Sequence, residues 1–313
     1  MTSPTARSFV LAIDVGGTKV ESALVDDRGT VLGASRHRAA TGAQASSEQL
    51  ASAVSSVVTR TRASLPAGAD LIGVGIGCAG PIHLPGVVSP LNLPVWREYP
   101  LKDLVAALVP DLTVRLRMDG LCITLAEHWV GAGQGIDNLM GMIVSTGIGG
   151  GLILGGVTVS GPTGNAGHIG HIEVGGFDDP CACGGVGCIE AVASGPKTVA
   201  WARTQGFTGE SGEDLAAAYA AADPVAVAAV TRSGHALGQA IASATTLLDL
   251  DLVAIGGGFS NVTPDLLDFA RSTIAGRVQF AYATRVRLVP SALSGDGPLI
   301  GAAALIHRAE LVP

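Results

Sequence analysis

Residues 164–195 constrain this chain more than any other segment, because they combine many glycines with metal-binding residue types. Cys181 and Cys183 are separated by one residue, Cys188 follows five residues later, and His171 stands ten residues before the first cysteine. Three thiolates and one imidazole are what a closed tetrahedral zinc site needs. Disulfides are the alternative, but a Cys-x-Cys pair is too close for a relaxed bridge, and three local cysteines cannot all pair. The segment therefore predicts a structural Zn²⁺ site at these four residues.

The composition predicts a globular protein with a small-molecule partner. The 313 residues are 48% hydrophobic and 14% charged, which is enough for two domains with cores of their own. The formal net charge is −7 and Lys and Arg form no cluster, so we expect no nucleic-acid partner, which would need a basic face. The apolar run at residues 9–13 is too short for a signal peptide. We therefore expect a cytoplasmic protein, in which reduced thiols are available to zinc.

A membrane span is the alternative for residues 139–167, which carry no charge. This segment is rich in Gly, Ser and Thr, which indicates buried strands and phosphate-binding loops instead. We therefore expect no membrane partner.

The first half of the chain is expected to open with antiparallel strands. Apolar runs at residues 9–15 and 19–25 flank a glycine tip, and a turn leads to a third strand at about residues 31–36. A helix follows over about residues 46–65, with Ser46 or Ser47 as its cap. Further strands are expected at residues 71–77 and 113–117, and further helices at residues 101–108 and from Asp119 to about residue 129.

The second half repeats the opening plan. A strand at residues 139–145, a glycine tip at residues 147–151 and a returning strand at residues 152–154 indicate an internal duplication. Helices are expected near residues 211–222, 223–248, from about 263 and at 297–309, with a strand at 252–255. We predict one domain from residues 1–118 with about 298–313, and a larger one from residues 119–297.

The glycine-rich segment resembles the signature of the ROK family (repressor, open reading frame, kinase). It reads GNAGHIGHIEV, CACGGVGCIE and ASG, where the family has GxAGExGHxxV, CxCGxxGCxE and ASG in the same order. The resemblance implies that His171, Cys181, Cys183 and Cys188 bind zinc, while His171 and Glu190 face the sugar. The alternative for Glu190 is a helix-start carboxylate favoured by the helix dipole. The family's sugar-binding Glu is His168 here, which leaves the sugar open.

Glycine turns elsewhere are candidate phosphate sites, because glycine lets backbone N–H groups approach phosphate oxygens. No Walker A sequence occurs. DVGGTK at residues 14–19 and STGIGGG at residues 145–151 resemble the two phosphate motifs of actin-like sugar kinases, and GGG at residues 256–258 resembles their adenosine loop. The resemblance assigns ATP binding to Asp14, Gly16, Gly17, Thr18, Lys19, Thr146, Gly147, Gly149, Gly150, Gly256, Gly257 and Gly258. Asp14 would hold Mg²⁺ directly or through water, and Thr18 would meet the γ-phosphate.

Asp119 is the candidate general base. Phosphoryl transfer to an alcohol needs one carboxylate near the attacking hydroxyl to accept its proton. The alternative role is a helix N-cap, and both roles can hold at a strand-to-helix junction. The family motif Asn-Asp-Ala-Asn reads Met118-Asp119-Gly120-Leu121 here, so both Asn positions are apolar. The loop at residues 78–96 resembles the family's sugar-contacting pieces at Gly86 and Asn92.

Other reactive residue types have no partner pattern. We expect surface or satisfied core positions for His83, His128, His235 and His307, and buried apolar positions for Cys78 and Cys122.

The resemblance implies an α/β fold of the two-domain actin-like ATPase type, with ATP and sugar in the cleft between the domains. It implies a Mg²⁺-dependent kinase for a primary hydroxyl of a hexose, similar to the ROK glucokinases. A kinase for a modified sugar, an aminosugar or a cyclitol, is the alternative, and Met118, Leu121 and His168 favour a ligand altered at one ring position, such as a cyclitol or modified hexose. Thirteen residues before Asp14 are too few for the helix-turn-helix domain of ROK repressors. A sugar-sensing regulator without catalysis is a third class, which the presence of Asp14 and Asp119 disfavours. Homodimers are common in the family.

Overall fold

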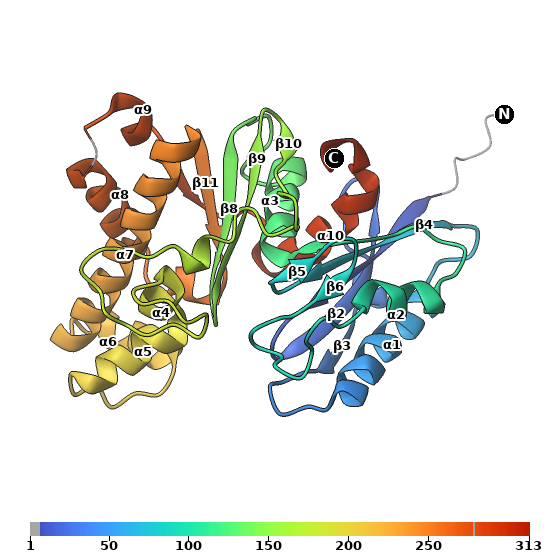
Figure 1. The fold of residues 1–313 in the computed structure, drawn as a ribbon, viewed down its shortest axis with the longest axis horizontal. Coiled ribbons are helices and arrows are strands. Elements are labelled where there is room, and N and C mark those ends of the chain that lie inside the picture. The colour runs from blue at the N-terminus through green and yellow to red at the C-terminus, as the bar shows by residue number, and fades with distance from the viewer. Residues whose placement is uncertain (1–6, 278) are drawn as a thin grey trace.

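The computed structural model describes residues 7–277 and 279–313, which form two lobes with a five-stranded sheet in each (Figure 1). The strands of the first sheet are β1 (Ser8–Val15), β2 (Lys19–Asp26), β3 (His37–Ala40), β4 (Asp70–Cys78) and β7 (Val114–Met118). Those of the second are β8 (Leu139–Val144), β9 (Ile148–Leu154), β10 (Val157–Thr158), β11 (Leu252–Gly256) and β12 (Arg287–Pro290).

The two sheets repeat one topology. Their orders are β3-β2-β1-β4-β7 and β10-β9-β8-β11-β12. In each, an antiparallel meander of three strands is followed by two strands that add in parallel. This repetition agrees with the internal duplication that the two glycine hairpins indicate.

The first sheet is covered on both faces. The helices α1 (Ser47–Ala63) and α2 (Leu101–Leu108) pack on one face, where Leu11 and Ile13 of β1 are buried. The C-terminal helix α10 (Gly297–His307) packs on the other face, where Val10 and Ala12 are buried. Burial of both faces explains why residues 9–13 of β1 are an unbroken apolar run. A small hairpin of β5 (Ile82–His83) and β6 (Val87–Val88) lies in the loop after β4.

Of the two serines expected to cap the first helix, Ser46 is the cap in the structure. Its hydroxyl accepts a hydrogen bond from the Gln49 N–H, and the Gln49 side chain accepts one from the Ser46 N–H, at 3.2 and 2.7 Å. This reciprocal pair satisfies two backbone donors that the first turn leaves open.

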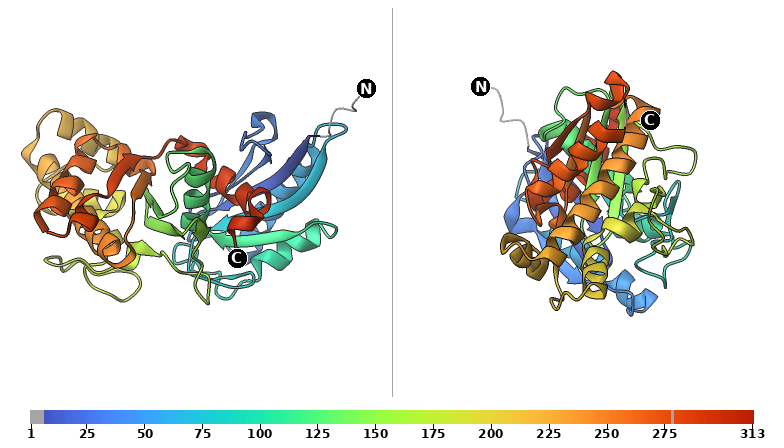
Figure 2. Two further views of the ribbon diagram at one scale, coloured as in Figure 1. Left: turned by 90° about the horizontal axis from the view of Figure 1, so that it is seen from above. Right: turned by 90° about the vertical axis from the view of Figure 1, so that its left-hand side faces the viewer.

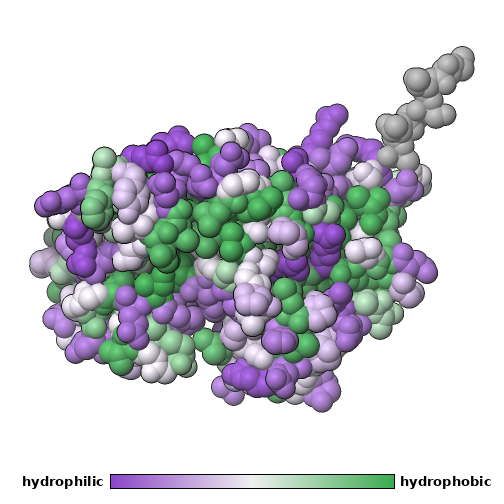
Figure 3. Space-filling model, turned by 45° about the horizontal axis from the view of Figure 1, so that its top comes forward, coloured by the Kyte–Doolittle hydropathy of each residue, from purple (hydrophilic) through white to green (hydrophobic). Residues whose placement is uncertain are grey.

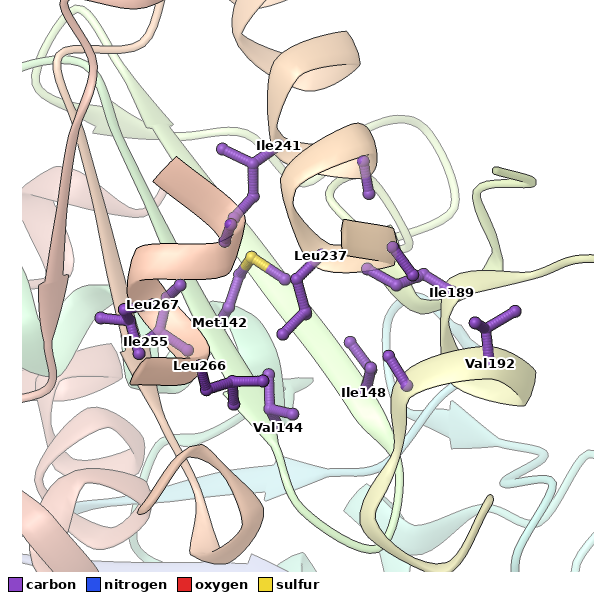
Figure 4. Close-up of a cluster of buried hydrophobic side chains, with 14 of the residues drawn as sticks. Met142, Val144, Ile148, Ile189, Val192, Leu237, Ile241, Ile255, Leu266 and Leu267 are labelled. Atoms are coloured by element: carbon purple, nitrogen blue, oxygen red, sulfur yellow. The ribbon is translucent and has the colours of Figure 1, made fainter. Parts of the chain in front are cut away.

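The second sheet carries the helices α4 (Ile189–Ala193), α5 (Gly195–Thr204), α6 (Gly212–Ala220), α7 (Pro224–Leu248), α8 (Asp265–Arg277) and α9 (Ala281–Thr284). Its core is formed where β8 meets the two long helices. Met142 and Val144 of β8 pack with Leu237 of α7 and Leu266 of α8 (Figure 4). Short 3-10 turns lie at Gly33–Ser35, Ile169–His171, Gly258–Asn261, Ser294–Asp296 and Ala309–Leu311.

Two helices lie between the sheets, namely α3 (Asp119–Val130) and α10 (Figure 2). They approach each other closely at Gly301, where a Cβ atom would lie 1.8 Å from the carbonyl oxygen of Cys122. Glycine is therefore required at this crossing. The division of the chain at residue 119, with α10 assigned to the first domain, remains our proposal.

Two details differ from the sequence-based expectations. The third strand was expected at residues 31–36, but residues 33–35 form a 3-10 turn in which the Ser35 hydroxyl accepts from the Leu24 N–H at 2.8 Å. The second glycine tip is shorter than expected, because β9 already begins at Ile148. Gly151 is a strand residue, and a Cβ atom there would lie 2.4 Å from the Cα of Leu121 in α3. Glycine at this position thus allows α3 to pack on the sheet.

No single helix in the described ranges has both the length and the apolar character needed to cross a bilayer. Only α6 and α7 taken together reach that length and apolar character, and they are bent by 113° at their junction.

Candidate functional site

A cavity of about 300 Å³ opens between the tips of the β1–β2 and β8–β9 hairpins. Both tips point to the lower middle of the molecule, where the surface is hollowed between the lobes (Figures 1 and 3). The cavity brings together most of the site residues expected from the sequence, namely Asp14, Gly16, Gly17, Thr18, Lys19, Asn92, Asp119, Thr146, Gly147, Gly149, His168, His171 and Glu190.

The first hairpin tip is held in place by its neighbours. The Gly16 N–H donates to the Lys19 carbonyl at 2.9 Å, and the Thr41 hydroxyl donates to the Gly16 carbonyl at 2.8 Å. A Cβ atom on Gly17 would lie 2.6 Å from Nδ2 of Asn92. The absence of a side chain at Gly17 therefore lets the loop that carries Asn92 close over the tip.

The second tip is tied to Glu190. The Ile148 N–H donates to Oε2 of Glu190 at 2.9 Å, and the Ser145 N–H donates to the Gly147 carbonyl at 2.9 Å. Glu190 lies in the first turn of α4, as the alternative role requires, but its carboxylate reaches across to the hairpin. The residue that follows the cysteine cluster is thereby linked to the glycine tip.

Asp119 occupies the first position of α3, and Met118 stands at the N-cap. The alternative of an Asp119 N-cap is therefore wrong by one residue. The Oδ1 atom of Asp119 accepts a hydrogen bond from the Gly120 N–H at 2.7 Å, and the carboxylate lines the cavity. Burial raises the pKa of Asp119; the Gly120 N–H opposes this shift and the nearby Glu190 adds to it. A raised pKa brings a carboxylate closer to the range useful for accepting a proton near neutral pH.

Asp14 shares the cavity with Asp119. Burial and, to a smaller extent, the charge of Asp119 together raise the pKa of Asp14 from 3.8 to about 7, while Lys19 opposes the shift. A cation bound beside Asp14 would favour its ionised form. Oxygen donors of this kind suit Mg²⁺, so the residues present fit a magnesium ion.

The raised pKa of Asp14 predicts a specific dependence of stability on pH. The folded protein binds this proton more tightly than the unfolded chain, so the stabilising effect is complete below the unfolded value of 3.8 and is lost as the pH rises to about 7. In the absence of Mg²⁺, we expect the free energy of unfolding of Asp14→Asn to lack this decrease with rising pH, because an amide does not ionise. Thermal unfolding in Mg²⁺-free buffer at about pH 5.5 and about pH 8 should show that the Tm of Asp14→Asn rises relative to that of the parent at the higher pH. An identical pH dependence in the two proteins would contradict this assignment.

His168 lines the cavity beside His171, with ring centroids 4.7 Å apart. Burial and, to a smaller extent, the neighbouring His171 together lower the pKa of His168 to about 4. A Cβ atom on Gly80 would lie 3.2 Å from Cε1 of His168 and 2.9 Å from Sδ of Met118. Met118 and Leu121 are buried, with 2% and 0% exposure, and do not line the cavity. Of the three departures from the family motif, His168 alone faces the cavity.

The four predicted metal ligands converge. The ligand atoms of His171, Cys181, Cys183 and Cys188 all lie within 4.8 Å of one another. Cys181 Sγ lies 3.5 Å from His171 Nδ1, and Cys183 Sγ lies 3.6 Å from Cys188 Sγ. A tetrahedral zinc ion places such ligand atoms about 3.6–3.8 Å apart, whereas a disulfide needs about 2.05 Å. All five cysteines are free, so the geometry fits a metal ion and not a bridge.

The cluster also has the chemistry of a metal site. Burial and the neighbouring thiols raise the pKa of Cys188 to about 12. A metal ion would offset this, because it binds the thiolate form. Since Nδ1 of His171 faces the thiols while His171 also lines the cavity, this residue joins the cluster to the site.

Several expected site residues do not line the cavity. Gly86 lies in the β5–β6 turn, where a Cβ atom would clash with Lys102 at 2.3 Å. Gly150 is buried in β9 against Ile169. Gly256 ends β11 against Ser291, and Gly257 and Gly258 follow that strand beside Val144 and Ser145. The cavity adds six lining residues without an assigned role: Ala79, Gly80, Leu91, Ile143, Ser145 and Ile148. Ser145 could have been found, because it opens the second phosphate motif.

Cys78 and Cys122 are fully buried, as expected. Of the histidines without a partner pattern, His83 and His235 are exposed, and Nε2 of His307 lies 3.1 Å from the Val25 carbonyl. The expectation is wrong for His128, because its Nδ1 is buried without a hydrogen-bond partner among the described residues.

Comparison with known proteins identifies relatives over the whole fold. The model of the ROK family matches residues 10–309. A glucokinase of Halalkalibacterium halodurans is 30% identical over 96% of both chains, and a kanosamine kinase of Amycolatopsis mediterranei is 33% identical over 95% of both. The ROK family glucokinase of Streptomyces griseus, solved in complex with glucose and AMPPNP, is 30% identical, with a TM-score of 0.82 over 96% of this chain and 99% of that chain. The α/β fold of the two-domain actin-like ATPase type is thereby confirmed.

Proposed function

Because this chain belongs to the ROK family and its relatives are sugar kinases, we propose that it transfers the γ-phosphate of ATP to a primary hydroxyl of a hexose or hexose-like sugar. The observation that carries this proposal is the position of Asp119. Its carboxylate lies in the same cavity as both glycine tips, so a hydroxyl bound to Asp119 would lie in the cavity that receives the donor phosphates.

In the proposed reaction Asp119 orients the sugar hydroxyl and accepts its proton as the oxygen attacks phosphorus. The Gly120 N–H bond fixes its side chain, and burial favours proton uptake. The two glycine tips offer backbone N–H groups to the phosphates, and Thr18 lies at the first tip. Asp14 would hold a magnesium ion, which, when bound, neutralises charge on the transferred phosphoryl group. The loop at Gly256, Gly257 and Gly258 is proposed to lie against the adenosine.

On the sugar side, His168, His171 and Glu190 are proposed to bind hydroxyl groups, with Asn92 closing the cavity. The cysteine cluster is proposed to hold a structural zinc ion that fixes His171. Gly86 would act only through the shape of its turn, since it does not line the cavity.

The proposal is tested by measuring ADP release with Mg²⁺ and ATP across a panel of hexoses, aminosugars and cyclitols. We expect release with at least one member of the panel and none without a sugar. Absence of release with every member would refute the assignment of a sugar kinase with these acceptors.

The nature of His168 favours a modified sugar. A neutral imidazole offers one donor and one acceptor, whereas the carboxylate at this position in the family accepts only and would also attract a cationic amine. We therefore expect a hexose altered at one ring position, or a cyclitol, to be a better substrate than glucose. His168→Glu should raise kcat/KM for glucose relative to that substrate by about tenfold or more.

The comparison uses kcat/KM for glucose and for the best analogue, in the parent and in His168→Glu. His235→Glu is the matched control, because His235 is exposed and lies outside the cavity. If glucose is already the best substrate of the parent and His168→Glu does not alter the ratio, the inference from His168 is wrong.

A further inference from the structure

Glu21 is a buried carboxylate that none of the sequence motifs explains. Only 2% of this residue is exposed. It lies on β2, paired in register with Asp14 of β1 and with Arg38 of β3. Paired residues on antiparallel strands point to the same side of a sheet. Asp14, Glu21 and Arg38 therefore form a row that runs from the cavity to the edge of the first sheet.

Three cations surround the Glu21 carboxylate. Lys19 Nζ lies 2.6 Å from Oε2, while Arg38 Nη2 and Arg36 Nε lie 2.9 and 3.1 Å from Oε1. Burial opposes ionisation, but the bonds from Lys19 and Arg38 outweigh it and hold the pKa of Glu21 below its usual value. The carboxylate is therefore ionised at neutral pH, held by one hydrogen bond from Lys19 and by ion pairs with the two arginines.

Of these cations, Lys19 is the one that lines the cavity. Its side chain is 46% exposed, and a lysine that is half exposed would sample many rotamers without a partner. An ammonium group has three N–H donors, and the bond to Glu21 occupies one of them. The remaining two donors are free to bind an anion, with less entropy lost because the group is already placed.

The charges around Glu21 offset one another. Lys19, Arg36 and Arg38 contribute three positive charges, while Glu21 and Asp296, which pairs with Arg36, contribute two negative charges. The carboxylate of Asp14, which is paired with Glu21 in the same row, balances the remaining positive charge when it is ionised. Arg36 and Arg38 thus offset the charge of Glu21, so that Glu21 can hold Lys19 without adding net negative charge of its own to the wall of the cavity.

We propose that Glu21 is a positioning residue, which holds the ammonium group of Lys19 at the wall of the cavity where the phosphates of the donor nucleotide bind. This inference rests on the proposed function, because it requires a nucleotide in this cavity. A purely structural role is the alternative, in which Glu21 only joins β2 to β3. That role predicts a loss of stability with no specific effect on the nucleotide.

A double-mutant cycle separates the two roles. We expect Glu21→Gln to raise KM for MgATP about tenfold and to change kcat less than about threefold, since a charge-assisted bond that places Lys19 is lost. Lys19→Met should raise KM at least as much. The double variant should resemble Lys19→Met, because Glu21 acts through Lys19. Two independent effects that multiply in the double variant would overturn the proposal.

Two further variants guard against a trivial loss of folding. Glu21→Asp keeps the charge but shortens the reach, so it should fold and still raise KM for MgATP while leaving KM for the sugar unchanged. An unchanged KM for MgATP would overturn the proposal. Glu127→Gln is the matched control, because Glu127 is fully buried and accepts from the Ala132 N–H at 2.7 Å in a structural position. It should lower Tm and leave KM for MgATP within about twofold.

The same cycle is measured on the Kd of MgATP by calorimetry. A parent protein that binds MgATP but phosphorylates no sugar would refute the proposed function, and the cycle on Kd would still decide the role of Glu21. A parent that binds no MgATP would overturn both.

Discussion

Asp119→Asn should lower kcat by about 10²- to 10⁴-fold, the usual range for removal of a general base. The amide has nearly the same shape, and its oxygen can still accept from the Gly120 N–H that Asp119 binds at 2.7 Å. We therefore expect the variant to keep the fold of α3, and its Tm and its Kd for MgATP should equal those of the parent. The amide oxygen cannot take up the proton of the attacking hydroxyl, so the loss should appear in turnover.

The measurement is steady-state ADP release at saturating sugar and MgATP, with thermal unfolding in parallel. Asp103→Asn is the matched control, because Asp103 is an exposed aspartate in the first turn of α2 and lies outside the cavity. If the turnover of Asp119→Asn is within a few-fold of that of the parent, Asp119 is not the general base. Its role would then be limited to the hydrogen bond that it accepts at the start of α3.

The purified protein should carry about one zinc ion per chain, and removing it should weaken both stability and sugar binding. Cys181→Ser breaks a cluster whose other members include His171, which lines the cavity, and Cys188, two residues before Glu190. The Ile189 N–H also donates to the Ile172 carbonyl at 2.9 Å, so the segments that carry the ligands are joined. We expect sugar affinity to fall by about 10- to 100-fold, the usual effect of disturbing groups around a metal site.

Metal analysis, thermal unfolding and sugar titration test this prediction. Cys78→Ala is the control, because this thiol is buried in the first lobe and lies outside the cluster. It should retain the metal. A parent protein without zinc, in which all three cluster thiols titrate freely in the folded state, is the result that would disprove the site.

Elements with strong local signals were predictable from the sequence. The apolar period and Ser46 cap predicted α1, and Asp223 with Pro224 predicted the start of α7, where the Asp223 side chain accepts two backbone N–H groups. The β3 strand was misplaced because it is an edge strand with alternating, partly exposed residues, and the turn before it depends on bonds of Ser35 to distant backbone. Such bonds have no local sequence signal.

The parts of the site that act through side chains could be predicted from the sequence. The parts that are formed by backbone could be predicted less well. The carboxylates, histidines and cysteines of the site could be identified from their residue types and spacing, and they do lie in the cavity and the metal cluster. Ala79 and Ile143 line the cavity because of where their strands end, which no residue type reveals. The departures at Met118 and Leu121 suggested an altered sugar contact, but both side chains are buried, and depth in the core depends on tertiary packing.

The placement of α10 has a consequence for biosynthesis. Val10, Ala12, Ala23 and Val25 are shielded from water by Leu299, Ala302 and Ala303. These two groups are separated by most of the chain, so one face of the first sheet stays uncovered until the ribosome has released residues 297–307. An N-terminal lobe of this kind cannot finish folding before the rest of the chain is made, and its bare apolar face is what chaperones bind during translation.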